Sequence, residues 1–205
     1  MRKAKINMKG LRKEVGKKAF PAFKAAVVPR IERALQRETL QLLADFEDHE
    51  ITKEIEGGPG ARNSSGTLGG YGNLFTFIGF NRGQDPISPI RSLLAKSIKV
   101  VSVRKQRNEL ALQLKFTVPT EQEIASVAPL PWASGSWTEA IERGISGVGR
   151  YLYSQDKGRF TTSRSGQAIE ASLEVRGSGS SSPTAYISEI LAKMLKDIEK
   201  SLKNL

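Results

Sequence analysis

The chain has 205 residues, a formal net charge of +11 at pH 7 and no cysteine. This length suits one well-cored domain and is marginal for two, and the lack of cysteine excludes disulfides, thiolate nucleophiles and cysteine-based metal sites. No apolar run approaches the roughly 20 residues that span a bilayer, and the first residues lack the apolar stretch of a signal peptide. We therefore expect a soluble protein that is made in a cytoplasm and does not enter a membrane.

Much of the positive charge lies at the N-terminus. Residues 1–18 carry eight Lys or Arg side chains and a single acidic one, Glu14. We expect a basic arm over residues 1–18 and a single domain over residues 19–205, with Arg2, Lys3 and Lys5 on a basic surface. Such an arm can bind nucleic acid, or it can equally be a disordered, solubilising end.

The first predicted element is a helix over residues 29–50. One face of it collects apolar residues at spacings of three, four and seven: Val28, Ile31, Leu35, Leu42 and Phe46. Pro29 suits the first turn, and Pro21 is expected to separate this helix from a shorter basic helix before it.

A long loop rich in glycine, serine and asparagine is predicted over residues 57–72. It runs into GGYGNLFTFIGF (residues 69–80), which raises the question of a phosphate-binding loop. The third glycine of the dinucleotide fingerprint is missing and no Gly-Lys-Ser/Thr is present. The aromatic TFIGF segment favours a buried strand, so we interpret Gly69, Gly70, Tyr71 and Gly72 as a hinge and interface loop.

A β-hairpin is predicted over residues 98–118. In ELALQLKFTV, apolar and polar residues alternate, which indicates a strand with one buried face and one solvent-exposed face. The polar turn RKQRN would expose Arg104, Lys105 and Arg107 at the tip of the hairpin, as candidates for a basic surface.

Five further elements are predicted, with two more flexible stretches, at residues 154–166 and 176–183. A short helix can start in residues 89–94, Thr120 is a candidate N-cap, and Ser136 or Thr138 can cap a helix that carries Ile141 and Ile145. A strand is a candidate at ASLEV, residues 171–175. A C-terminal helix opens at Ser182-Pro183, with an apolar stripe of Ile187, Ile190, Leu191, Met194, Leu195, Ile198 and Leu202. The predicted fold class is α+β: a small antiparallel sheet packed by a long N-terminal helix and a C-terminal helix, with long flexible loops.

No constellation of residues indicates catalysis. His49 has Asp45, Asp48 and Glu50 nearby, but the other members of a triad or metal site are not seen. Trp132 and Trp137 can stack on bases or sugars, although packing of a turn onto the sheet or onto a neighbouring subunit is favoured. We therefore predict that the chain is not an enzyme and holds no metal or cofactor.

Four motifs, in this order, resemble the neck and tail-completion proteins of tailed bacteriophages, especially those with contractile tails. They are HEITKEIEGG, SGTLGGYGNLFTFIGFNRGQDPI, PLPWASGSWTEAIERGISGVGRYLY and SRSGQAIE, and the resemblance spans roughly residues 46–200. It implies a virion protein, assembled in the host cytoplasm, that forms a homo-oligomeric ring at the head–tail junction, a hexamer if it matches a sixfold tail tube. There it would complete the tail or join it to the connector, touching adjacent connector and tail proteins, with genomic DNA in the lumen.

Candidate interface residues under this interpretation are Gly69, Gly70, Tyr71, Gly72, Trp132 and Trp137. The alternative is a free, basic nucleic-acid-binding protein whose electrostatic footprint is the N-terminal arm.

Overall fold

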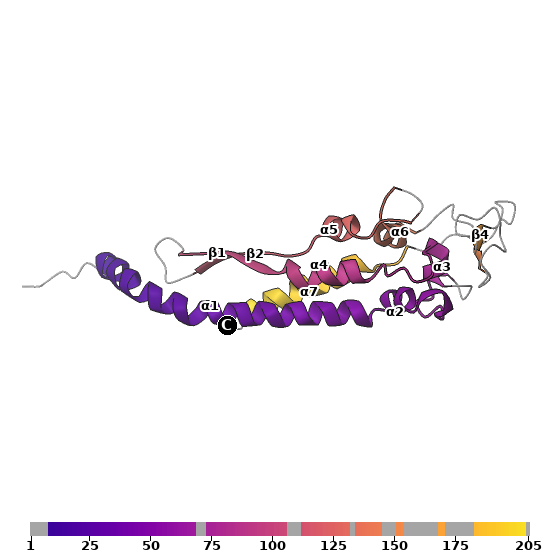
Figure 1. Ribbon diagram of the computed structural model, residues 1–205. Helices are drawn as coiled ribbons and strands as arrows, with labels where there is room; N and C mark the ends of the chain where they lie inside the picture. Colours follow the sequence, from indigo (N-terminus) through magenta and orange to yellow (C-terminus); the bar gives the residue numbers. More distant parts are fainter. Residues whose placement is uncertain are drawn as a thin grey trace, which may run out of the picture.

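The computed structural model describes residues 8–68, 73–105, 112–131, 134–144, 151–153, 168–170 and 183–203, with the backbone alone given for 8–18, 101–105, 112, 151–153 and 168–170. The elements are, in chain order, α1 (Met8–Asp48), α2 (Glu50–Glu56), the 3-10 turn η1 (Gly58–Gly60), α3 (Leu74–Ile78), α4 (Ser88–Ser97), β1 (Lys99–Lys105), β2 (Leu112–Thr117), α5 (Glu121–Ser126), α6 (Trp137–Arg143), β3 (Tyr151–Tyr153), β4 (Ala168–Glu170) and α7 (Ile187–Lys203). They form an elongated α+β body in which α1 runs along one side (Figure 1). The predicted fold class is confirmed.

Helix α1 is longer than predicted. It begins at Met8 and continues through Pro21 and Pro29, so the expected break at Pro21 is wrong. Both prolines are exposed, and the helix bends instead of ending. The bend is visible in the N-terminal half of α1 (Figure 1), and residues 8–18 of the predicted basic arm are helical.

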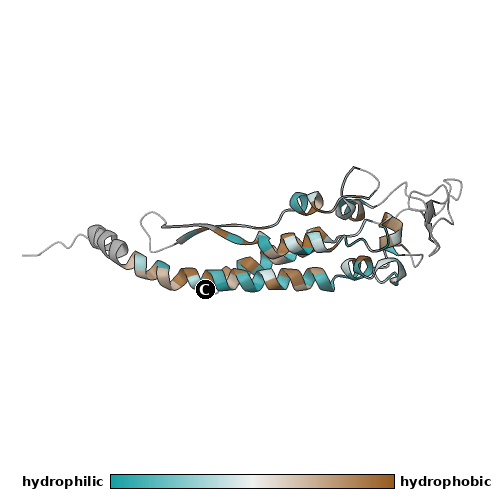
Figure 2. Cartoon of the chain, viewed as in Figure 1, coloured by the Kyte–Doolittle hydropathy of each residue, from teal (hydrophilic) through white to brown (hydrophobic). Residues whose placement is uncertain are grey.

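Helix α7 packs along α1 and closes the main core. The predicted stripe holds for the residues that are buried: Ile187, Ile190, Leu191, Met194 and Ile198. Leu195 is the exception, because half of its surface is exposed. An ion pair and a hydrogen bond also join α7 to α1. Lys193 Nζ lies 2.7 Å from Asp45 Oδ1, and Ser201 Oγ donates to Glu38 Oε1. Hydrophilic and hydrophobic residues alternate along both helices, as expected for amphipathic packing (Figure 2).

The predicted hairpin is confirmed as the antiparallel pair β1–β2, with a register shift between Val100 and Ser102. Leu114 and Phe116 are half-buried and pack against the core, whereas Gln113, Lys115 and Thr117 are exposed. A second antiparallel pair is formed by β3 and β4. The strand predicted at residues 171–175 and the hairpin tip at residues 106–111 lie outside the described residues.

The predicted strand at TFIGF is wrong, because residues 74–78 form the helix α3 and Gly79 and Phe80 follow its end. Asn73 caps α3 by accepting the amide of Thr76, and Gly79 ends it in the left-handed region, with φ of 88°. All five residues of α3 are buried, so the apolar run that suggested a strand reflects a helix enclosed on every side.

The C-terminal helix α7 begins at Ile187 instead of at the predicted Ser182-Pro183, whereas three other predicted helix starts are confirmed. Pro89 lies in the first turn of α4, Thr120 forms a capping box with Glu123 on α5, and Ser136 caps α6 through the amide of Thr138.

Candidate functional site, a buried polar cluster beside the 57–73 loop

A buried carboxylate holds both sides of the loop that follows α2. Glu54, on α2, is 1% exposed. Its Oε1 accepts the amide of Leu74 at 2.7 Å, and its Oε2 accepts the amide of Ser65 at 3.0 Å. One side chain therefore joins α2 to the middle of the loop and to the first residue of α3.

Asn73 holds the same loop from its other end, and Glu54 and Asn73 together are called the buried clamp below. Its Nδ2 donates to the carbonyls of Pro59 and Ala61, each at 3.0 Å, while its Oδ1 accepts the amide of Thr76 at 2.9 Å. Residues 57–68 are thus tied to the core at several points. The amides of Leu74 and Thr76 are already bonded to Glu54 and Asn73, which argues against a phosphate at this glycine-rich segment.

A cluster of packed aromatic rings in the core contacts α2. The Tyr186 ring stacks on Trp137 and on Phe46, with centroids 6.1 and 6.2 Å apart, and Phe80 meets Trp137 edge-on at 6.0 Å. The Tyr186 hydroxyl lies 2.7 Å from Thr52 Oγ1. Burial raises the pKa of Tyr186 far above its ordinary value, so this phenol stays protonated at neutral pH and serves as a structural hydrogen-bond partner.

His49 occupies the junction between α1 and α2. Its Nδ1 accepts the amide of Ile51 at 3.2 Å, which makes it the N-cap of α2, and its ring lies 4.8 Å from that of Tyr186. Burial lowers the pKa of His49, while the charges of Glu189 and Glu50 oppose that shift. The neutral imidazole is therefore the form that fits both the burial and the cap.

This arrangement predicts that the protein loses stability as the pH falls below about 6.5. The unfolded chain takes up a proton on His49 near its ordinary pKa of 6.5, whereas the folded chain does so only at lower pH. The free energy of unfolding should therefore fall through the window between those two pKa values and level off below it. Urea denaturation at several pH values measures the slope, and NMR of this sole histidine gives its folded pKa.

A matched variant separates titration from capping. His49→Asn keeps a side-chain acceptor at the N-cap but has no proton to gain, so its stability should be flat across the same window. A slope equal to that of the unchanged chain would show that other groups cause the dependence.

The described residues show no reactive arrangement in this cluster. Within them, no group of three or more His, Asp or Glu side chains is placed to hold a metal ion. Asp45, the expected neighbour of His49, instead bonds Lys193 and Gln41. Buried hydrogen bonds that satisfy Glu54, Asn73 and Tyr186 are what a loop-positioning scaffold requires.

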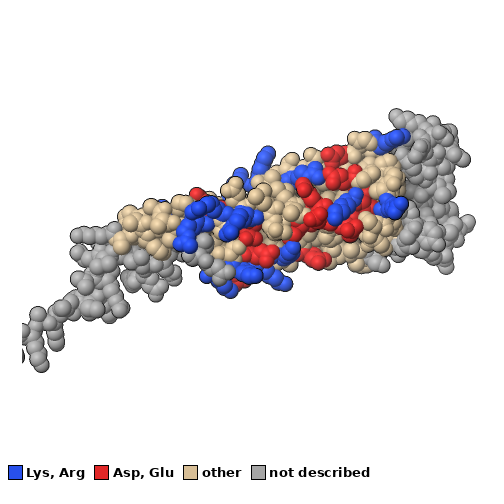
Figure 3. All heavy atoms as spheres, turned by 90° about the horizontal axis from the view of Figure 1, so that it is seen from below, with Lys and Arg blue, Asp and Glu red and all other residues tan. Residues whose placement is uncertain are grey.

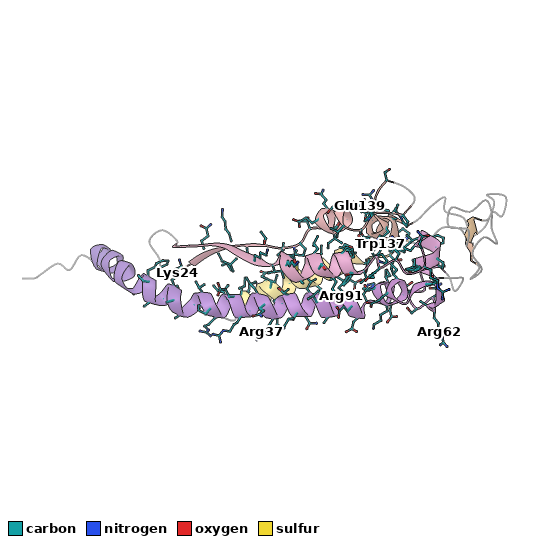
Figure 4. All side chains as sticks on the ribbon, in the orientation of Figure 1. Lys24, Arg37, Arg62, Arg91, Trp137 and Glu139 are labelled. Carbon is teal, nitrogen blue, oxygen red and sulfur yellow. The ribbon has the colours of Figure 1, made fainter. Side chains whose placement is uncertain are left out.

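The predicted interface residues fall in two groups. Trp137 lies in the core, 1% exposed, instead of on a surface, because its ring fills the space between Phe80 and Tyr186 (Figure 4). The remaining candidates, Gly69, Gly70, Tyr71, Gly72 and Trp132, lie outside the described residues. Of the predicted basic surface, Arg104 and Lys105 lie at the end of β1 with only their backbone described, whereas Arg2, Lys3, Lys5 and Arg107 lie outside the described residues.

None of the described helices is long and apolar enough to cross a membrane. Comparison of the chain with protein-family models, with curated proteins and with solved structures gives no match.

Proposed function

We propose that the chain is a structural subunit of a bacteriophage neck, which forms a ring at the head–tail junction and completes the tail or joins it to the connector. The observation that carries this proposal is the ordered set of four motifs between residues 49 and 170. The α+β body and the long paired helices fit the subunit that the resemblance implies.

The buried clamp supports a role in assembly. Helices α2, α3 and α6 gather at one end of the elongated body, away from the projecting N-terminal half of α1 (Figure 1). Glu54 and Asn73 fix the loop at that end before any neighbour arrives. A preformed edge lowers the ordering cost of association, and a ring requires each subunit to present one edge to the next by heterologous contacts that close.

Electron microscopy of phage particles and of the purified protein tests the proposal. We expect a closed ring of this chain at the head–tail junction, with sixfold symmetry if it matches a tail tube. Particles made without the chain should accumulate as separate heads and tails, and supplying the chain in trans should restore joining. Scattered single copies in the virion, or normal particles without the chain, would contradict the proposal.

A second candidate is a free nucleic-acid-binding protein, which the basic N-terminal segment favours. A binder that neutralises about six phosphates should lose on the order of a thousandfold in affinity between 50 and 200 mM salt. A neck subunit needs no tight phosphate contacts, because DNA must slide through the lumen, so weak, non-specific binding is expected. Nanomolar duplex binding at physiological salt that is lost when the Lys and Arg residues of positions 1–18 become glutamine, together with absence from virions, would decide for the binder.

A further inference from the structure

Charge is segregated along the rod formed by α1 and α2. Residues 8–37 contain nine basic side chains and two acidic ones, whereas residues 38–56 contain seven acidic side chains and one lysine, Lys53. Helix α1 alone is about 60 Å long at 1.5 Å per residue, so the two charged parts occupy different stretches of a long rod. Seen from the α1 side, basic side chains cover one part of this rod and acidic ones gather toward α2 (Figure 3).

One exposed stripe of α1 carries both charges. Its members recur at alternating spacings of three and four, which places them on a single seam of the kind that helices use to pair: Arg30, Arg33, Arg37, Leu40, Ala44 and Glu47. All six are exposed. Leu40, between the basic and acidic parts, is 62% exposed, the highest value for a large hydrophobic residue among those whose burial the structure describes, and Arg37 projects away from the body (Figure 4). The seam lies opposite the Leu35 and Leu42 face that enters the core.

The arginines of this seam are not balanced by ion pairs within the described part of the subunit. Arg30, Arg33 and Arg37 form no ion pair with a carboxylate of the described residues. On the acidic part, Glu47 pairs with Arg91, Asp45 with Lys193 and Asp48 with Lys53. Even with these three ion pairs, residues 38–56 keep an excess of negative charge. The side chains of Asp48 and Glu50 are 82% and 57% exposed.

We propose that this seam pairs with the same seam of a second copy, in an antiparallel arrangement with the two Leu40 side chains near its centre. Two copies that meet through the same face form an isologous contact, related by a twofold axis. The antiparallel direction sets the arginines of each copy against Glu47, Asp48 and Glu50 of the other. A parallel pair in register would instead set like charges together.

The contact is independent of the neck ring, which needs heterologous contacts, and it describes the subunit in solution. Its ion pairs are exposed and therefore screened by salt, and one helical seam buries less surface than a permanent dimer does. The dimer is accordingly weak, dependent on concentration and sensitive to salt.

Sedimentation equilibrium of the full chain with two charge-reversal variants tests the proposal. The unchanged chain should dimerise at 50 mM salt and lose at least tenfold in affinity at 500 mM salt. Arg33→Glu/Arg37→Glu reverses two of the three arginines of the seam, and Asp48→Lys/Glu50→Lys reverses two of the three acids that face them across the contact, so each variant alone should be monomeric. An equimolar mixture of the two should restore the dimer, because the substituted charges of each chain then face charges of opposite sign on the other.

Leu40→Lys should weaken the dimer at least tenfold, whereas the matched control Leu195→Lys, at an exposed leucine of α7, should not. Circular dichroism verifies that each variant is folded. A monomeric unchanged chain at low salt, or variants that dimerise alone, would overturn the proposal. It would also fail if the arginine substitutions left the mass unchanged and abolished only the retention of duplex DNA, because nucleic acid would then be the occupant of the seam.

Discussion

Replacing Trp137 with alanine should lower the free energy of unfolding by about 3–5 kcal/mol, the range found when a buried aromatic side chain is deleted. The indole is 1% exposed. It contacts Phe80, which follows α3, and Tyr186, which directly precedes α7. Its removal leaves a cavity where these segments meet, and it also removes aromatic pairs with a favourable geometry. Urea denaturation followed by far-UV circular dichroism measures the loss.

The same substitution discriminates between a core role and an interface role for this residue. Trp137→Phe should cost less than alanine because the ring still fills part of the space, and it keeps the test informative if the alanine variant does not fold. Leu195→Ala is the exposed control and should change stability by no more than about 0.5 kcal/mol. If Trp137→Ala were as mild as the control while ring formation failed, the tryptophan would belong to an interface, as the sequence had suggested.

Local signals in the sequence were sufficient to predict several elements. The alternation in residues 109–118 predicted the hairpin because its two faces differ in burial, and Thr120 and Ser136 are caps that act through neighbouring amides. The stripe of α7 predicted its buried face. In each case the physical cause lies within a few residues of its effect.

The errors arose where the surrounding structure overrode a local preference. The apolar residues of α3 have high β-propensity, yet Asn73 before them and Gly79 after them are a helix cap and a helix stop. Pro21 predicted a break between two helices and Pro29 a helix start, but α1 continues through both at exposed positions with a bend.

The buried cluster was missed because its bonds join distant residues. In the sequence, nothing distinguishes Glu54 from the other acidic residues of α2. Its hydrogen-bond partners, Ser65 and Leu74, follow 11 and 20 positions later. Tyr186 meets Thr52 across 134 residues. Of this cluster, only Asn73 could be recognised from neighbouring residues, because it is an N-cap whose bonded amide, that of Thr76, lies three positions later.

Glu54→Ala should be the second severely destabilising substitution. It removes the acceptor for two buried or partly buried amides, those of Leu74 and Ser65. Each orphaned donor costs about 1–3 kcal/mol, so the free energy of unfolding should fall by roughly 2–6 kcal/mol. Glu54→Gln keeps the shape but turns an NH2 group toward one of the two amides, so its loss should be about half as large.

The matched control is Glu56, on the same helix and two residues further on. Its carboxylate pairs with Arg91 at 2.6 Å but is 49% exposed, so Glu56→Ala should cost no more than about 1 kcal/mol. Limited proteolysis then locates the effect: the Glu54 variants should be cut within residues 57–73 faster than either the unchanged chain or the Glu56 variant. If the Glu54 variants lost stability without faster cleavage of this loop, the carboxylate would stabilise the core without fixing the loop. The preformed edge that supports ring assembly would then need another cause.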